Sequence, residues 1–354
     1  MADEADRAGR FVLRDPTSIG VAFLGVGRMG RTHIQTLAGI GNVRVVVVGD
    51  SDPAAAERGR AIARAGRATS DPLDAIGDPE VDAVVIATPT STHAALIEAA
   101  LRAGKATWSE KPIALDLLET NRVVELWRAT GLPVQLGFMR RFDPGYVRAR
   151  ALIEAGKLGR IEQFRAYSRD TYPPSAEFLP GSGGSFLDMS VHDFDLARFL
   201  VGEIDEVSAW GSVLIDDVFR AAGDVDTAVT MLRFRDGALG VVEMSRRSAW
   251  GYDIRTEVAG AKGKVVIEAP HKTPLTWSRR SGFEGDHFEN FPDRFEAGYR
   301  LELEAFFAAL TEGRAPDPGP EEALETLRVA IAARRSWREG RPVRVDEVSA
   351  ASPA

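Results

Sequence analysis

The chain has 354 residues, enough for two domains that each hold their own core, and its 44% hydrophobic and 27% charged residues are ordinary for a globular enzyme. Its formal net charge of −8 argues against nucleic acid as a partner, and no apolar run approaches the roughly 20 residues that span a bilayer. The absence of cysteine excludes disulfides, thiolate nucleophiles and cysteine-bound zinc, and it fits a reducing compartment.

The first ten residues, MADEADRAGR, are polar and carry no hydrophobic signal core. We therefore expect residues 1–18 to form a flexible tail and the protein to be cytoplasmic.

Short β-rich runs alternate with helical stretches in the first part of the chain. The predicted strands are 19–24, 43–48, 83–87, 106–109 and 134–136, and the predicted helices are 29–38, 53–65, 92–103 and 116–129. Continuous apolar strands such as VRVVVV indicate a parallel sheet buried on both faces, and the alternation with helices indicates a doubly wound α/β fold. We expect this domain to cover residues 19–140.

The pattern changes after residue 140. A Gly/Pro/Ser-rich loop at 171–185 leads into a predicted helix that bears Asp188 and His192, and the runs 207–214, 227–234, 238–247, 253–260 and 263–269 alternate polar with apolar residues. This period of two predicts an α/β domain over 141–346 with a large open, mainly antiparallel sheet. An open sheet face is often covered by another subunit, so a dimer or tetramer is expected. The C-terminal helix, predicted at 321–338, is a candidate to pack back on the first domain.

A glycine-rich turn lies between the first predicted strand and helix. The sequence GVGRMG at 25–30 fits the pattern G-x-G-x-x-G in the strand–turn–helix context that gives it meaning. Gly25 allows the tight turn, Gly27 lets the backbone approach a pyrophosphate at the helix N-terminus, and Gly30 lets helix and strand pack closely. A glycine-rich turn without a ligand is the alternative interpretation.

Two further strand ends favour a nicotinamide dinucleotide. Asp50 lies where an acid bonds the adenosine ribose and repels a 2′-phosphate, which favours NAD over NADP. The alternative is that Asp50 caps the helix that starts at Pro53, a role that Asp52 could fill equally well. After the fourth strand, ATPTSTH at 87–93 places threonines where ligands gather, and His93 is either an ordinary first-turn residue or part of the nicotinamide pocket.

An acid/base cluster is predicted from Lys111, Asp188 and His192. The last two residues are four apart, so on one helix they share a face, and with a lysine they suit removal of a proton from an alcohol. On its own, an aspartate and a histidine four residues apart are more often a surface ion pair. The cofactor motif in the same chain is what favours the catalytic interpretation. A metal site with Asp195 lacks a third histidine at ligand spacing, so no metal is predicted. His33, on the first helix, is predicted to be structural.

These motifs resemble the glucose-fructose oxidoreductase/inositol dehydrogenase family over nearly the whole chain after the tail. The resemblance is carried by GVGRMG, ATPTSTH, EKP at 110–112, GFMRRFD at 137–143 and GGSFLDMSVHDFDLARFL at 183–200. It implies a Rossmann domain, an open-sheet α/β domain and a tetramer, and GDVDTA at 223–228 leans toward the bacterial inositol 2-dehydrogenase branch. It also implies a cis bond between Lys111 and Pro112.

The resemblance further implies roles for individual residues. Lys111 bonds the nicotinamide ribose and the substrate hydroxyl, His192 removes the hydroxyl proton, and Asp188 orients His192. The candidate cofactor-binding residues are Gly25, Gly27, Arg28, Met29, Gly30, Asp50, Ser51, Thr88, Pro89, Thr90, His93, Glu110, Lys111, Met139 and Arg140. The candidate substrate-binding residues are Lys111, Asp170, Asp188, His192 and Tyr252. Asp170 departs from the asparagine of many inositol enzymes, which leaves the substrate open.

The sequence therefore predicts NAD-dependent oxidation of a cyclic polyol, first of all of myo-inositol to 2-keto-myo-inositol (scyllo-inosose). Another inositol isomer, an aminocyclitol precursor or a pyranose sugar is the enzymatic alternative. A non-catalytic dinucleotide-binding sensor is the alternative from another class, although it would not need the lysine, aspartate and histidine.

Overall fold

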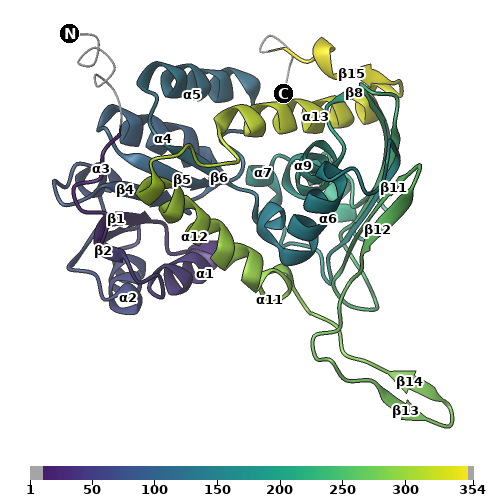
Figure 1. Cartoon of the computed structure of the whole chain (residues 1–354), viewed down its shortest axis with the longest axis horizontal. Coiled ribbons are helices and arrows are strands. Elements are labelled where there is room, and N and C mark those ends of the chain that lie inside the picture. The colour runs from purple at the N-terminus through teal and green to yellow at the C-terminus, as the bar shows by residue number, and fades with distance from the viewer. Residues whose placement is uncertain (1–10, 350–354) are drawn as a thin grey trace. The chain divides into compact units, whose positions relative to one another are not determined.

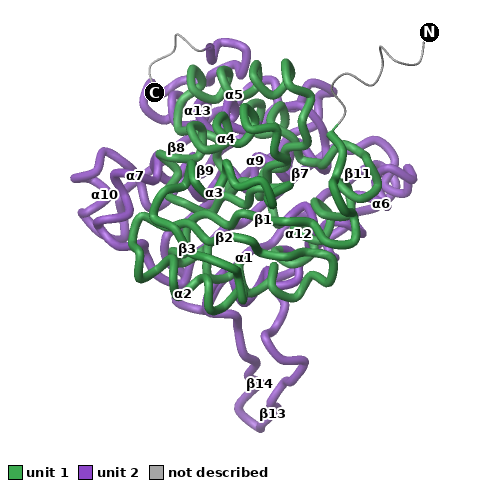
Figure 2. Tube along the Cα trace, turned by 90° about the vertical axis from the view of Figure 1, so that its left-hand side faces the viewer, with its two compact units in different colours: residues 1–139, 299–325, 354 green, residues 140–298, 326–353 purple. Residues whose placement is uncertain are grey.

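The structure, a computed structural model, describes residues 11–349 and divides into two compact units (Figure 2). Within the described range, unit 1 holds residues 11–139 and 299–325, and unit 2 holds residues 140–298 and 326–349. Each unit is thus built from two separate stretches of the chain. The predicted boundary at residue 140 lies where the units divide, whereas 299–325, which the sequence places in the second domain, belongs to unit 1.

Unit 1 is built on a six-stranded parallel sheet with the strand order β3-β2-β1-β4-β5-β6 (Figure 1). Its strands are β1 (Ile19–Leu24), β2 (Val43–Gly49), β3 (Arg67–Thr69), β4 (Ala83–Ile86), β5 (Ala106–Glu110) and β6 (Val134–Gly137). This is the strand order of the doubly wound dinucleotide-binding fold, and the predicted Rossmann domain is confirmed. Every residue of β1 and β4 is buried, as expected for central strands covered on both faces.

Several helices of unit 1 begin at capping aspartates that the sequence contains. The helices of this unit are α1 (Arg28–Leu37), α2 (Pro53–Ala63), α3 (Pro72–Ile76), α4 (His93–Arg102), α5 (Leu117–Thr130), most of α12 (Glu296–Glu312) and the start of α13 (Pro320–Glu339), with the short 3₁₀ helix η1 (Thr90–Thr92). Asp52 and Asp71 cap α2 and α3, each directly before a proline at the first helical position, where proline fits best. β3 and α3 are only three and five residues long, and neither was predicted from the sequence.

The core of unit 1 combines residues from both ends of the chain. Leu303, Phe306, Phe307 and Leu310 of α12 are buried in one cluster with residues of β1, β4 and β5. Phe11 and Leu13 pack against the same cluster, and Arg14 Nε lies 2.6 Å from Asp82 Oδ1. The described part of the predicted tail, residues 11–18, is therefore attached to the core, and residues 1–10 lie outside the described range.

Unit 2 is built on a seven-stranded sheet with the order β12-β11-β7-β10-β9-β8-β15. Its strands are β7 (Ile161–Arg169), β8 (Ile204–Ser212), β9 (Thr227–Phe234), β10 (Leu239–Ser245), β11 (Asp253–Gly260), β12 (Gly263–Ile267) and β15 (Val343–Arg344). Only β7 and β10 pair in parallel, so the predicted mainly antiparallel sheet is confirmed. A hairpin of β13 (Trp277–Arg279) and β14 (Gly282–Glu284), which the sequence analysis missed, projects beyond this sheet (Figure 1).

Helices cover one face of this sheet, and the other face is open. The helical segments of unit 2 are η2 (Met139–Phe142, from its second residue), α6 (Pro144–Glu154), α7 (Leu179–Ser182), α8 (Ser185–Asp188), α9 (Val191–Leu200), α10 (Asp217–Ala221), α11 (Phe291–Arg294), the rest of α13 and η3 (Val345–Glu347). Alternate residues of β9 are buried, and Val229 and Met231 between them are exposed. The register places Trp210 and Leu239 on that same exposed face.

Within residues 11–349 no helix combines the length and the apolar character that crossing a membrane requires.

Candidate functional site

The predicted cofactor residues of unit 1 gather at one edge of its sheet. The glycine-rich turn follows β1, Asp50 follows β2, Thr88 comes soon after β4, and Lys111 follows β5. Because all six strands are parallel, their carboxyl ends meet at the same edge, which is where open α/β sheets bind ligands.

Two of the three glycines in the turn are required by the backbone. Gly25 has φ +90°, and a Cβ there would lie 2.6 Å from the carbonyl group of Ala87. A Cβ on Gly30 would lie 1.9 Å from the carbonyl oxygen of Gly25. A larger residue at position 25 would strain the turn and collide with the chain that follows β4, and one at position 30 would push α1 away from the turn.

Gly27 is different, because a Cβ built on it would meet nothing within 4 Å. Gly27 is the N-cap residue of α1, and no side chain caps this helix end. The helix N-terminus therefore offers its N–H groups and its positive dipole to an anion that approaches over a bare backbone. A pyrophosphate fits this cradle, so the residues present suit NAD.

Asp50 holds the glycine-rich turn in place and does not cap α2. Its Oδ2 accepts a hydrogen bond from the backbone N–H of Val26 at 2.7 Å, and its Oδ1 accepts one from Asp52 at 2.9 Å. Asp52 is the N-cap of α2 and accepts from the N–H of Ala54 at 2.9 Å. The capping alternative for Asp50 is thereby removed.

Replacing Asp50 with asparagine is expected to raise the KM for NAD about tenfold or more and to weaken discrimination against NADP. One hydrogen bond to a charged group contributes about 1.5–3 kcal/mol, and the carboxylate also repels a 2′-phosphate. Steady-state kinetics with both cofactors measure the effect. Asp52→Asn is the matched control, because asparagine caps a helix equally well and this position faces α2. Unchanged cofactor kinetics in Asp50→Asn would remove Asp50 from this role.

His93 connects the ends of two strands. Its Nδ1 lies 2.8 Å from the carbonyl oxygen of Pro112, and its Nε2 lies 2.9 Å from that of Thr88. The ring is only 1% exposed, so His93 is more than an ordinary first-turn residue. Nearby, the hydroxyl groups of Thr88 and Thr92 are 2.7 Å apart.

Glu110 and Lys111 lie at the same edge of the unit 1 sheet, where its strands end. The Oε1 of Glu110 lies 2.7 Å from Nε2 of His33, and its Oε2 accepts from the backbone N–H of Lys111 at 3.2 Å. Burial acts to raise the pKa of Glu110, but the hydrogen bond from His33 and the charges of His33 and Lys111 hold that pKa below its usual value. The Lys111–Pro112 bond is cis, which confirms what the resemblance implies.

A second buried carboxyl lies close to this group. Glu302 of α12 is fully buried, and neither side-chain oxygen has a hydrogen-bond partner among the described residues. Burial, together with the nearby charge of Glu110, raises the pKa of Glu302 well above its usual value. Burial thus favours the protonated form of Glu302, whereas the contact with His33 favours the ionised form of Glu110.

Replacing Glu302 with glutamine is expected to stabilise the protein at pH 8. The folded protein holds a proton on Glu302 that the unfolded chain releases above its ordinary pKa of about 4.3, so wild-type stability falls as the pH rises from there toward the raised folded value. Glutamine removes this loss, so the free energy of unfolding of the variant should exceed that of the wild type by more at pH 8 than at pH 5. Unfolding midpoints at pH 5 and pH 8 test this, with Glu304→Gln, a partly exposed side chain on the same helix, as control. An equal difference at both pH values contradicts it.

In unit 2, the candidate substrate residues also meet at a sheet edge. Asp170 follows β7, Arg246 follows β10, and Tyr252 precedes β11. Because β7 and β10 are parallel and β11 is antiparallel to β7, these three positions lie at one edge. A pocket of about 520 Å³ lies beside them and is lined by their chain neighbours Thr171, Tyr172, Arg247, Ser248 and Gly251, among others.

Arg246 joins the candidate residues of unit 2, although it was not predicted from the sequence. Its Nη2 donates to Asp188 at 2.9 Å and its Nη1 to Asp170 at 3.3 Å, while Arg246 itself is only 3% exposed. Burial raises the pKa of Asp170, Arg246 opposes that shift, and the charge of Asp188 adds to it. The signal that could have found Arg246 is its place at the end of a strand, directly beside the strand that leads to Asp170.

The prediction that Asp188 and His192 share one helix is wrong. Asp188 ends α8, and α9 begins at Val191. The N–H of Ser190 donates back five residues to the carbonyl of Ser185, which closes α8, and the N–H groups of Asp193 and Phe194 then bond to Ser190 to start α9. His192 is thus in the first turn of a new helix and is half-buried.

Arg140, predicted near the nicotinamide, is engaged inside unit 2. Its Nη1 donates to Asp193 at 2.7 Å, and it is only 3% exposed. The nearby Tyr252 has a pKa raised first of all by burial, with Arg140 opposing that shift and Asp170 adding to it. Met139 is buried at the end of unit 1. No group of residues within 11–349 has the composition of a metal site.

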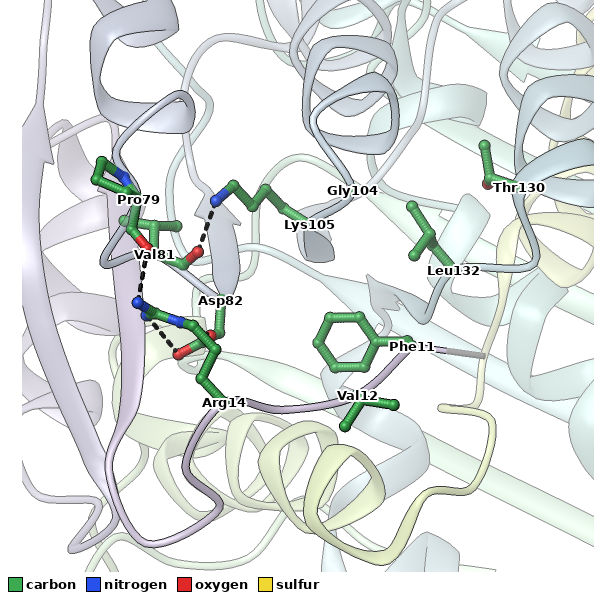
Figure 3. Close-up of a pocket in the computed structure, with 10 residues that line it drawn as sticks. All are labelled: Phe11, Val12, Arg14, Pro79, Val81, Asp82, Gly104, Lys105, Thr130 and Leu132. Carbon is green, nitrogen blue, oxygen red and sulfur yellow. Dashed lines mark hydrogen bonds and ion pairs between the residues drawn. The ribbon is translucent and has the colours of Figure 1, made fainter. Parts of the chain in front are cut away.

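A further pocket, of about 530 Å³, lies at the other edge of the unit 1 sheet (Figure 3). Asp82 and Lys105 line it and directly precede β4 and β5, so it lies at the amino ends of the strands. Its basic side chains are already bonded, Arg14 to Asp82 and Lys105 to the carbonyl of Val81 at 2.7 Å. This pocket is separate from the edge that carries the glycine-rich turn.

Comparison with known proteins also gives two domains. Residues 19–138 match an oxidoreductase family's NAD-binding Rossmann fold, and residues 150–345 match the same family's C-terminal alpha/beta domain. The chain is 40% identical over 327 residues to the scyllo-inositol 2-dehydrogenase (NAD(+)) of Bacillus subtilis, a match that covers 92% of this chain and 96% of that protein. It is 36% identical over 330 residues to the myo-inositol 2-dehydrogenase of Thermotoga maritima, over 93% and 99% of the two chains.

A solved structure shares the fold. The scyllo-inositol dehydrogenase of Lactobacillus casei, with bound NAD(H) and scyllo-inositol, superposes with a TM-score of 0.88 at 32% identity, over 93% of this chain and 99% of that chain. Both domains and nearly the full length of the chain therefore match one group of enzymes. The chain belongs to the glucose-fructose oxidoreductase/inositol dehydrogenase family of oxidoreductases.

Proposed function

We propose that the protein oxidises a ring hydroxyl of an inositol to a ketone with NAD. The observation that carries this proposal is the 40% identity to an NAD-dependent inositol 2-dehydrogenase over 92% of the chain. Two features of the structure support it. The glycine-rich turn with its open helix N-terminus suits the binding of a cofactor, and the buried polar cluster around Arg246 suits the binding of a polyol.

When bound, NAD supplies the acceptor for the hydride. In the proposed reaction the imidazole of His192 takes the hydroxyl proton, because imidazole changes its charge near neutral pH. The ammonium group of Lys111 stabilises the charge that develops on the oxygen. Asp188 and Asp170, held by Arg246, accept hydrogen bonds from neighbouring hydroxyls of the ring.

The candidate substrates are myo-inositol and scyllo-inositol. myo-Inositol has its one axial hydroxyl at C2, and scyllo-inositol is the epimer in which that hydroxyl is equatorial. Oxidation at this carbon gives the same ketone from either, 2-keto-myo-inositol. myo-Inositol is our first candidate, and the B. subtilis and L. casei relatives are the observations that favour scyllo-inositol as the second.

A panel of inositol isomers, aminocyclitols and pyranoses, each with NAD and with NADP, tests the proposal by the rate of NADH or NADPH formation. The expected result is NADH formation with myo- or scyllo-inositol and little reaction with NADP. A protein that binds NADH but reduces NAD with none of these substrates would instead be a dinucleotide-binding sensor.

We also propose that further copies of this chain cover the open face of the unit 2 sheet, as a dimer or tetramer. Trp210 is 60%, Met231 51% and Leu239 54% exposed on that face, which is costly to leave in water. Light scattering behind a sizing column, with Met231→Lys beside the wild type, measures the mass in solution.

A cytoplasmic location is proposed from the composition of the chain and from the need for a cellular NAD pool. Cell fractionation tests it.

A further inference from the structure

We propose that His33 and His93 are positioning residues that hold residues 110–112 from two sides and so fix the place from which Lys111 acts, an inference that rests on the proposed function. Neither histidine was predicted to have this role. His33 is on α1, directly after the glycine-rich turn, and His93 begins α4. Both rings are buried, at 0% and 1% exposure.

The first contact precedes Lys111 in the chain. Nε2 of His33 lies 2.7 Å from Oε1 of Glu110, at the end of β5. A carboxylate can only accept hydrogen bonds, so the proton of this bond is on Nε2 of His33. The other oxygen of Glu110 accepts the backbone N–H of Lys111 at 3.2 Å. One carboxylate thereby ties the helix of the glycine-rich turn to the backbone of Lys111.

The second contact follows Lys111. Nδ1 of His93 lies 2.8 Å from the carbonyl oxygen of Pro112, and Nε2 lies 2.9 Å from that of Thr88. Carbonyl oxygens can only accept hydrogen bonds, so the ring nitrogens of His93 are the donors in these contacts. His93 thereby connects the loop after β4 to the residue after Lys111.

The surroundings restrict the ring of His33 to one orientation. Trp108 meets it edge-on with ring centroids 4.6 Å apart, and Tyr299 meets it at 5.4 Å. Glu110 is also the group whose pKa is held low by its contact with His33, in spite of burial. A residue placed by two buried contacts, with a rigid ring behind one of them, is well suited to chemistry that needs accurate placement, since an error of about 1 Å can cost about 10² in rate.

The experiment compares His33→Leu, which removes the donor, with His33→Gln, which keeps an N–H group near the position of Nε2. Thr36→Val is the control, because Thr36 is on the same helix and its hydroxyl bonds only within that helix. The expected result for His33→Leu is a fall in kcat of up to about 10² with little change in NADH affinity, measured by fluorescence titration. His33→Gln should recover most of the loss.

A second measurement does not depend on turnover. The rate at which acetic anhydride acetylates Lys111, followed by mass spectrometry against the exposed Lys157 in the same sample, should change in His33→Leu and return in His33→Gln. If the wild type oxidises no inositol, the proposed function fails, and this rate still decides whether His33 positions Lys111.

Unchanged kcat and unchanged Lys111 acetylation in His33→Leu would overturn the proposal, as would equal losses in the leucine and glutamine variants. If His33→Leu does not fold, Glu110→Gln replaces it, because it keeps the shape of the side chain and removes the charge. Wild-type kcat in Glu110→Gln would then overturn the proposal.

Discussion

Replacing His192 with alanine is expected to lower kcat for inositol oxidation by about 10²–10⁴, the usual contribution of a general base. The KM for NAD and the affinity for NADH should stay near the wild-type values, because the proposed role of His192 is to accept a proton. The wild-type rate should rise with pH as the imidazole loses its proton, and this rise should be absent in the variant.

Steady-state kinetics between pH 6 and pH 9 and NADH fluorescence titration provide the measurements. His271→Ala is the matched control, since His271 is exposed and its ring neighbour is another histidine, His287, at 6.0 Å. If His192→Ala keeps its activity and the wild-type pH profile, another group is the base and the assignment of His192 is wrong.

Replacing Arg246 with methionine is expected to cost about 3–5 kcal/mol of unfolding free energy, the typical cost of removing one partner of a buried ion pair. The guanidinium side chain is 4% exposed, and it serves two carboxylates that are themselves largely buried, Asp170 at 24% and Asp188 at 21%. Methionine fills a similar volume without charge, so the loss reports on the charges and not on an empty cavity.

The loss should depend on pH in a defined direction. Burial already raises the pKa of Asp170 and Arg246 opposes it, so the pKa rises further in the variant. A carboxyl with a raised folded pKa destabilises the protein above that value and stops doing so below its unfolded pKa. The difference between wild type and variant should therefore be larger at pH 8 than at pH 5.

Denaturant unfolding at both pH values measures this difference. Arg300→Met is the control, since Arg300 is an exposed side chain 2.6 Å from Glu304 and such surface pairs contribute about 0–1 kcal/mol. Equal costs for the two substitutions would contradict the assignment of Arg246 as the centre of the cluster.

The sequence predicts most of the fold because local patterns determine it. The runs VRVVVV and TAVTMLRF are typical of a buried parallel strand and of a half-exposed strand, and β2 and β9 have those burial patterns. β3 and the β13–β14 hairpin escaped prediction because they are three residues long and partly or fully exposed, so no hydrophobic period marks them.

Only part of the candidate site can be predicted from the sequence. Gly25, Gly27 and Gly30 occur in a local motif, so their roles follow from spacing alone. Arg246 is 58 residues from Asp188 and 76 from Asp170, and only the sheet register brings them together. The prediction that Asp188 and His192 share one helix face failed for a different reason. A spacing of four residues does not reveal that a new helix starts at Ser190.

The place of α12 in the first core has a consequence for biosynthesis. Leu303, Phe306, Phe307 and Leu310 complete the packing around β1, β4 and β5, yet the ribosome makes them more than 190 residues after the end of β5, which is Glu110. An apolar surface of the nascent nucleotide-binding unit therefore stays exposed until α12 has been synthesised. A fragment that stops near residue 140 should consequently aggregate or recruit chaperones, although it contains every strand of its own sheet.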